Sequence, residues 1–111
     1  MFRIKFELLG EQIQLNDQKE IIIFRIIQEA FNNILKHSDC KKIHLIISYT
    51  QQNIQISIED DGRGFLSNTT KSKQGAAGLK NMQSRTKILA GTMELQSSPG
   101  KGTKLTFKIP F

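Results

Sequence analysis

The sequence predicts one α/β domain, a two-layer sandwich in which helices back a mixed, mostly antiparallel sheet of about five strands. Its length of 111 residues suits a single domain with one hydrophobic core. Several short segments alternate apolar and polar side chains, as half-buried strands do, whereas one longer segment repeats apolar residues at helical spacing. We therefore expect residues 1–111 to form one unit without a second domain.

The first strand is predicted at residues 3–8, because charged and apolar residues alternate there. The apolar set, Ile4, Phe6 and Leu8, falls on one face of such a strand. We expect that face to be half-buried against the rest of the domain.

A long helix is predicted to follow, from a cap at Asn16 or Asp17 to about Ser38. Apolar residues recur along it at the spacing of an amphipathic helix. The residues expected on its buried face are Ile23, Ile26, Ile27, Ala30, Ile34 and Leu35.

The rest of the chain is predicted to supply four more strands and a second helix. The strands are expected at residues 42–49, 53–59, 92–96 and 103–109. The second helix is expected at residues 79–89, with Gly91 as its stop. A polar stretch at residues 67–74 has almost nothing to bury and is expected to be a mobile loop.

Composition restricts the class of protein. No apolar run approaches the roughly 20 residues of a membrane-spanning helix. The single cysteine, Cys40, cannot form an intrachain disulfide, so nothing requires an oxidising compartment and a cytoplasmic location is expected. The net charge of +6 leaves a nucleic-acid binder as an alternative, but dispersed lysines and the absence of Trp disfavour it.

The polar face of the long helix carries the first candidate functional residues. Glu29, Asn33, Lys36 and His37 share one side of the helix. Asn is a poor helix former, so the adjacent Asn32 and Asn33 cost stability in mid-helix. The side-chain oxygens of Glu29 and Asn33 point the same way, which suits Mg²⁺. Taken alone, the pattern is more simply explained as a solvated helix face.

A second candidate segment, Asp60-Asp61-Gly62-Arg63-Gly64, directly follows a predicted strand. An acidic side chain at a strand end can accept a hydrogen bond from the amino group of a base. The two glycines allow the backbone to approach a ligand closely. Taken alone, however, the segment is more simply explained as a turn.

Two glycine-containing segments complete the set. Residues 75–82 place small side chains before a helix start, where free N–H groups and the helix dipole favour an anion. The segment Gly100-Lys101-Gly102-Thr103 is not a Walker A motif, because Leu95 stands where the first Gly of that motif would fall.

In this order, the segments resemble the ATPase domains shared by DNA gyrase, mismatch-repair proteins and histidine kinases. Residues 24–37 resemble the N box, and residues 78–85 the G box, of sensor kinases related to nitrate and membrane-fluidity sensors. The resemblance covers about residues 4–110. It implies a Bergerat-type ATP-binding fold and the catalytic domain of a two-component sensor histidine kinase.

The resemblance also implies roles for particular residues. Asn33 corresponds to the residue that binds Mg²⁺ beside ATP, and Glu29 to the acid that positions water or assists the phosphoacceptor. Both are therefore expected to be catalytic, with Glu29 reaching the metal only through water. Lys36 and His37 are expected to approach the phosphates, and Asp60 to bind the adenine amino group.

Five further positions are expected to contribute to the ATP site: Gly62, Gly64, Gly78, Leu79 and Thr103. Residues 67–77 correspond to the lid over the triphosphate. The lid departs from the family pattern, because Ala76 replaces one of its usual hinge glycines. This departure is expected to affect lid mobility and nucleotide affinity.

By the same resemblance, the γ-phosphoryl group of ATP is expected to pass to a histidine on a separate dimerisation domain, and then to a response regulator. We expect that domain to be absent from this chain and the full-length protein to be a homodimer. The chain would be a cytoplasmic domain, typical of a membrane-bound bacterial sensor. The alternatives are an anti-sigma-factor-type serine kinase and a degenerate, non-catalytic interaction module.

Overall fold

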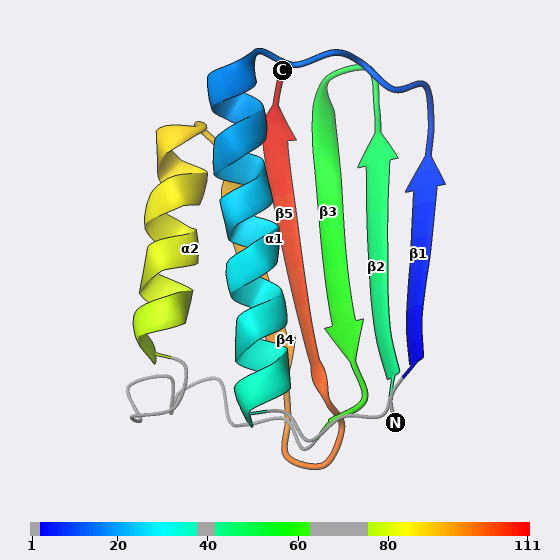
Figure 1. The fold of residues 1–111 in the computed structure, drawn as a ribbon, viewed down its shortest axis with the longest axis vertical. Coiled ribbons are helices and arrows are strands. Elements are labelled where there is room, and N and C mark those ends of the chain that lie inside the picture. Colours follow the sequence, from blue (N-terminus) through cyan, green and yellow to red (C-terminus); the bar gives the residue numbers. More distant parts are fainter. Residues whose placement is uncertain (1–2, 38–41, 63–75) are drawn as a thin grey trace.

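The computed structural model describes residues 3–37, 42–62 and 76–111, apart from the side chains of residues 37 and 76–78. The elements in chain order are β1 (Arg3–Leu9), α1 (Asp17–His37), β2 (Lys42–Tyr49), β3 (Asn53–Asp60), α2 (Ala76–Ile88), β4 (Thr92–Ser97) and β5 (Thr103–Pro110) (Figure 1). The predicted strands and helices are all present in this order. The predicted stretch at residues 67–74 lies outside the described residues.

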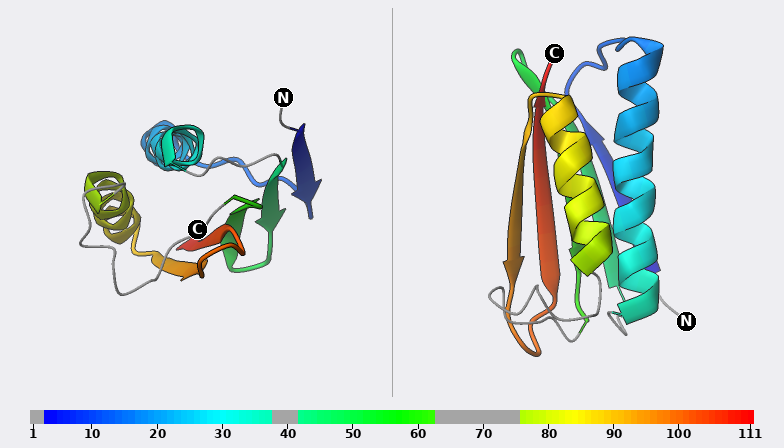
Figure 2. Two further views of the ribbon diagram at one scale, coloured as in Figure 1. Left: turned by 90° about the horizontal axis from the view of Figure 1, so that it is seen from below. Right: turned by 90° about the vertical axis from the view of Figure 1, so that its left-hand side faces the viewer.

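The five strands form one sheet with the order β1-β2-β3-β5-β4. Only β1 and β2 run parallel, and the other neighbouring pairs are antiparallel. A parallel pair needs a crossover connection, which α1 supplies. Both helices lie on the same face of the sheet (Figure 2). The predicted mixed, mostly antiparallel two-layer fold is therefore confirmed.

A side-chain cap fixes the start of α1. The backbone N–H of Lys19 donates to Oδ1 of Asn16 at 2.8 Å, so Asn16 rather than Asp17 is the cap. Asp17 and Glu20 lie in the first turn, where negative charge is favourable to the helix dipole.

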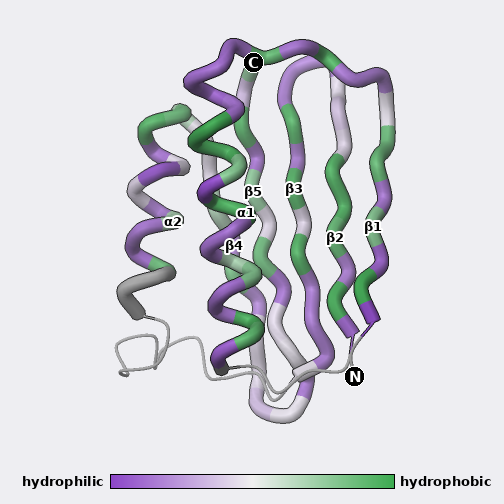
Figure 3. The backbone as a smooth tube through the Cα atoms, viewed as in Figure 1, coloured by the Kyte–Doolittle hydropathy of each residue, from purple (hydrophilic) through white to green (hydrophobic). Residues whose placement is uncertain are grey.

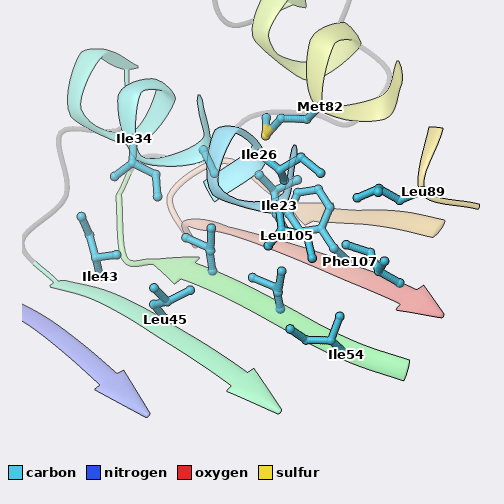
Figure 4. Packing of buried hydrophobic residues seen from close by; sticks show 14 residues of the cluster. Ile23, Ile26, Ile34, Ile43, Leu45, Ile54, Met82, Leu89, Leu105 and Phe107 are labelled. Carbon is cyan, nitrogen blue, oxygen red and sulfur yellow. The ribbon is translucent and has the colours of Figure 1, made fainter. Parts of the chain in front are cut away.

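The core fills the space between the helices and the sheet (Figure 4). Ile26 and Ala30 of α1, Met82 of α2, Ile56 of β3 and Phe107 of β5 are all fully buried. Among the residues described, no helix is both long enough and apolar enough to cross a membrane.

Two predictions about burial were wrong. The face of β1 that carries Ile4, Phe6 and Leu8 is largely exposed rather than half-buried, with exposed fractions of 57%, 56% and 49%. The reason is that β1 forms one edge of the sheet and neither helix extends over it (Figure 3). Leu35 is also exposed, at 56%, because it is rotated about 100° from its buried neighbour Ile34 around the helix.

The end of α2 also differs from the prediction. The N–H groups of Ala90 and Gly91 donate to the carbonyls of Lys87 and Thr86, both at 2.9 Å, which is the pattern of a Schellman motif. The left-handed position of this motif is Ala90, with a φ of 58°, and not the predicted Gly91. Gly91 instead allows a close approach to β5, since a Cβ there would lie 2.6 Å from the carbonyl oxygen of Lys108.

Substitutions at these two adjacent positions should therefore have opposite effects. Ala90→Gly relieves the unfavourable φ and should raise the free energy of unfolding by about 0.5–1 kcal/mol. Gly91→Ala adds a methyl group against the backbone of β5 and should lower it by about 1–3 kcal/mol. Urea unfolding of both variants beside the unaltered chain measures the two changes. A loss of stability in Ala90→Gly would contradict the assignment of the cap.

Candidate functional site

Strand pairing brings together residues from three strands at one end of the sheet. In the register of β3 with β5, Asp60 lies opposite Thr103. In the register of β4 with β5, Ser97 lies opposite the same Thr103. These three polar residues, here called the Asp60 row, continue the buried face that Ile58 and Leu105 form beneath the helices. Asp60 and Thr103, expected separately from the sequence, are thus neighbours.

The carboxylate of Asp60 is nearly buried, with 5% of the residue exposed. Its Oδ1 accepts a hydrogen bond from the backbone N–H of Gly62 at 2.8 Å. A buried carboxylate needs such donors, because burial without them is costly. The bond holds the carboxylate in place at the end of β3 and gives Gly62, itself buried, a definite role in the site.

Asp61 has a different task from its neighbour. Its Oδ1 accepts the backbone N–H of Lys42 at 2.8 Å, and its own N–H donates to the carbonyl of Lys42 at 3.3 Å. Asp61 therefore ties the end of β3 to the start of β2, whereas Asp60 faces the side of the sheet that carries the helices.

The hairpin between β4 and β5 fits closely against Asp60. Gly102 has a φ of +76°, and a Cβ on it would lie 2.0 Å from the carbonyl oxygen of Asp60. The hydroxyl of Ser97 donates to the carbonyl of Gly102 at 2.9 Å and also lies 2.9 Å from Oγ1 of Thr103. Ser97 was not among the residues expected from the sequence. A hairpin of five residues between 97 and 103 could have indicated it, because such a turn places these residues opposite one another.

A hollow of about 420 Å³ opens at this end of the sheet. Its lining residues come from the end of β3, from β4, and from the hairpin and start of β5. They are Glu59, Asp60, Leu95, Gln96, Ser97, Ser98, Lys101, Gly102, Thr103 and Lys104. The Asp60 row is therefore open to a ligand even though Asp60 itself is nearly buried.

The polar side of α1 is not a uniformly solvated face. Glu29 and Asn33 are half-buried, in contrast to the exposed Asn32 and Lys36. Both residues border the buried row of the helix that includes Ala30. Two polar side chains beside the core, four positions apart, favour a binding role over simple solvation. The side chain of His37 is outside the described residues, although its backbone completes α1.

The C-terminal end of α1, the N-terminal end of α2 and the Asp60 row lie at the same end of the domain (Figure 1). Because α2 begins at Ala76 rather than at the predicted residue 79, Gly78 and Leu79 lie in its first turn. Ala76 is helical, and Ala suits a helix better than the Gly it replaces. Leu79 is half-buried and packs against the core. Gly64 and residues 67–75 lie outside the described residues.

Gly102 should be far less replaceable than Gly100, although both have positive φ. At Gly100, with a φ of +78°, no atom of the described residues lies within 4 Å of an added Cβ. Gly100→Ala therefore tests the backbone strain alone, of about 1–2 kcal/mol. Gly102→Ala adds the contact with Asp60 and should cost about 1–3 kcal/mol more. Chemical denaturation of both variants measures the difference, and equal losses would show that the hairpin does not depend on this contact.

Comparisons with known proteins agree with this architecture. The family described as histidine kinase-, DNA gyrase B-, and HSP90-like ATPase matches residues 18–111. The signal transduction histidine-protein kinase/phosphatase DegS of Bacillus subtilis is 36% identical over 111 residues, which cover 97% of this chain and 29% of DegS. The sensor histidine kinase LiaS of the same organism is 33% identical over 88 residues, covering 79% of this chain and 24% of LiaS. The chain thus spans less than a third of these relatives.

Solved structures show the same fold. The histidine kinase domain of the blue-light activated histidine kinase from Erythrobacter litoralis EL346 superposes with a TM-score of 0.79 at 20% identity, over 96% of this chain and 54% of that one. The histidine kinase AdeS of Acinetobacter baumannii superposes with a TM-score of 0.73 at 21% identity, over 96% of this chain and 54% of that one. The predicted relation to nitrate and membrane-fluidity sensors is not tested by these comparisons. The chain belongs to the family of histidine kinase-, gyrase B- and HSP90-like ATPases, and its relatives place it with the ATP-binding domains of histidine kinases.

Proposed function

We propose that this chain binds ATP with Mg²⁺ and delivers the γ-phosphoryl group to a histidine on a separate dimerisation domain. The observation that carries the proposal is the Asp60 row, a nearly buried carboxylate held by Gly62 beside the hydroxyl of Thr103. Ionised carboxylates accept hydrogen bonds only. Asp60 is therefore suited to the amino group of adenine, with Thr103, Gly62 and Gly64 shaping the surroundings of the base.

The phosphates would extend from the base toward the ends of the two helices. The first turn of α2, with Gly78 and Leu79, supplies backbone N–H groups that have no partner within the helix, and the positive end of a helix dipole. Lys36 is exposed on the last turns of α1 and is suited to an anion, with His37 beside it. Both helix ends lie at the end of the domain that carries Asp60 (Figure 1).

The chemistry of Asn33 fits a weakly held Mg²⁺. No group of three or more His, Cys, Asp and Glu side chains is gathered for a metal in the described part of the chain. Mg²⁺ bound with ATP keeps several waters and takes one or two protein ligands besides the phosphate oxygens. The half-buried amide of Asn33 would be that ligand, and Glu29, four residues earlier, would hold a coordinated water. When bound, the metal would neutralise phosphate charge.

The contribution of the chain to phosphoryl transfer would then be positioning and charge neutralisation. The Asp60 row would hold the base, α2 and Lys36 would hold the phosphates, and Glu29 would lie near the acceptor. None of these groups is a phosphoacceptor, so we expect residues 1–111 alone to bind nucleotide without autophosphorylation.

The wider role of the protein is also a proposal. Relatives are named as signal transduction and sensor histidine kinases, and this chain covers 29% and 24% of two of them. We therefore propose that residues 1–111 form one catalytic domain that acts with a separate dimerisation and phosphoacceptor domain in a homodimer. The phosphoryl group would pass to a response regulator in a two-component phosphorelay, on the cytoplasmic side of a membrane-bound bacterial sensor.

Nucleotide should stabilise the domain in a way that depends on these residues. A non-hydrolysable ATP analogue with Mg²⁺, at about 100 times its dissociation constant, should add roughly 2.7 kcal/mol to the free energy of unfolding. Thermal melting should record this as a shift of several degrees in a domain of this size. The shift should vanish in Asp60→Asn, because an amide in place of the carboxylate weakens the acceptor.

A second variant tests the Mg²⁺ ligand independently of the base-binding residues. Asn33→Ala should keep a smaller shift that no longer depends on Mg²⁺, whereas Asn32→Ala, an exposed neighbour on the same helix, should behave like the unaltered chain. No shift at millimolar nucleotide would contradict the proposal and favour a non-catalytic interaction module. Phosphorylation of a serine on a partner protein would instead favour an anti-sigma-factor-type kinase.

A further inference from the structure

Strand β1 leaves an apolar edge of the sheet uncovered. The side chains of Ile4, Phe6 and Leu8 lie on the face that carries the helices, since their neighbours in the parallel register include the core residues Ile43 and Leu45. Neither helix extends over them, and about half of each residue is exposed (Figures 2 and 3). Long apolar edge strands are uncommon on natural sheets, because their backbone groups can pair with a further strand. This edge therefore indicates an interaction surface.

The opposite face of β1 carries a charge pair. Nζ of Lys5 lies 3.2 Å from Oε1 of Glu7, two residues along the strand, and Oε2 of Glu7 lies 3.6 Å from Nε2 of His44 on β2. The side chain of Lys5 is 68% exposed, so it can also reach a carboxylate on a strand placed beside β1. In the described part of the chain, β1 has a neighbouring strand on one side only.

The sequence of β1 is complementary to itself in one antiparallel register. When Phe6 lies on a twofold axis, it faces Phe6 of a second copy, and Ile4 faces Leu8. In the same register Lys5 of each copy lies opposite Glu7 of the other, so both charges meet an opposite charge. Registers centred on Lys5 or on Glu7 instead place like charges directly opposite each other, which is destabilising.

We propose that β1 is a self-association surface at which two copies of this chain pair their β1 strands antiparallel about Phe6. The pairing would join the two five-stranded sheets into one continuous sheet and give the backbone groups of both edges hydrogen-bond partners. The apolar side chains would form cross-strand pairs on one face, and Lys5 and Glu7 on the other. The twofold axis closes the assembly at two copies, because each copy uses the same edge.

This contact goes beyond the nucleotide-binding function proposed above and does not depend on it. The Asp60 row belongs to β3, β4 and β5, and β2 separates β1 from these strands. Antiparallel pairing would direct the Asp60 rows of the two copies to opposite ends of the joined sheet. Both candidate sites would remain open, so substitutions in β1 should leave nucleotide binding unchanged.

Self-association can be measured by sedimentation equilibrium of the 111-residue chain from micromolar to millimolar concentration. We expect a reversible monomer–dimer equilibrium. Lys5→Glu makes both paired charges negative, and Glu7→Lys makes both positive, so each variant alone should associate roughly tenfold more weakly. A one-to-one mixture of the two variants should recover the association, because each strand then meets its charge complement. This recovery separates a charge effect from misfolding of either variant.

A disulfide tests the register. In a Cys40→Ser background, Phe6→Cys places two thiols opposite each other on the axis. The Cα atoms of directly opposed residues are about 4.5–5.5 Å apart, a separation that a disulfide can span. Ile4→Cys is the matched control on the same exposed face, since its two copies would lie roughly 13 Å apart along the strands. Mild oxidation should therefore produce a covalent dimer of Phe6→Cys and not of Ile4→Cys.

Three results would overturn the inference: a chain that stays monomeric at millimolar concentration, a mixture of the reversed variants that fails to associate, and equal crosslinking of the two cysteine variants. The exposed face of β1 would then belong to another occupant, such as a helix of the separate dimerisation domain. Nucleotide binding is measured separately. Its absence from a chain that dimerises would contradict the proposed function and leave this inference standing.

Discussion

The antiparallel pairing of β3 with β5 is the interaction on which the candidate site depends. Asp60 and Thr103 belong to motifs far apart in the sequence, and this register alone makes them neighbours. Gly102 allows the pairing to continue to the end of the strands, because any side chain there would meet the carbonyl of Asp60. The sheet also carries most of the core beneath both helices, so its formation produces the hydrophobic core and the candidate site together. A mutation that shifted this register by one residue would place Asp60 and Thr103 on opposite faces of the sheet.

Several polar residues of the candidate site occupy buried or half-buried positions. Asp60 is nearly buried and requires the N–H of Gly62 as a hydrogen-bond donor. Glu29 and Asn33 are half-buried at the border of an otherwise apolar helix face, where apolar side chains would pack better. Natural proteins tolerate such positions when the rest of the fold offsets them. Here the offset comes from fully buried residues such as Ile26 and Phe107, which lie away from the polar end.

Local signals predicted the elements well, because alternation and helical spacing act over a few residues. They failed to predict burial and turn geometry, which depend on contacts with other elements of the fold. The apolar face of β1 has suitable periodicity, yet neither helix covers this edge of the sheet. Leu35 lies beside the buried row of α1 rather than in it, and it is exposed. Residue type predicted that α2 ends at Gly91, but Ala90 holds the left-handed position. Gly91 is a glycine because a Cβ there would clash with the backbone of β5. At the site, residue types indicated Asp60 and Thr103, whereas Ser97 becomes meaningful only through strand pairing.

The two ends of the candidate site differ in chemistry. At the Asp60 row, the N–H of Gly62 donates to the carboxylate of Asp60, and the hydroxyl of Ser97 donates to the carbonyl of Gly102. A carboxylate accepts hydrogen bonds, whereas the first turn of α2 and Lys36 present donors and positive charge. An adenine nucleotide has the opposite arrangement, with a donating amino group at one end and accepting phosphates at the other. This opposition would favour a single orientation of the nucleotide, with its phosphates directed to the helix ends.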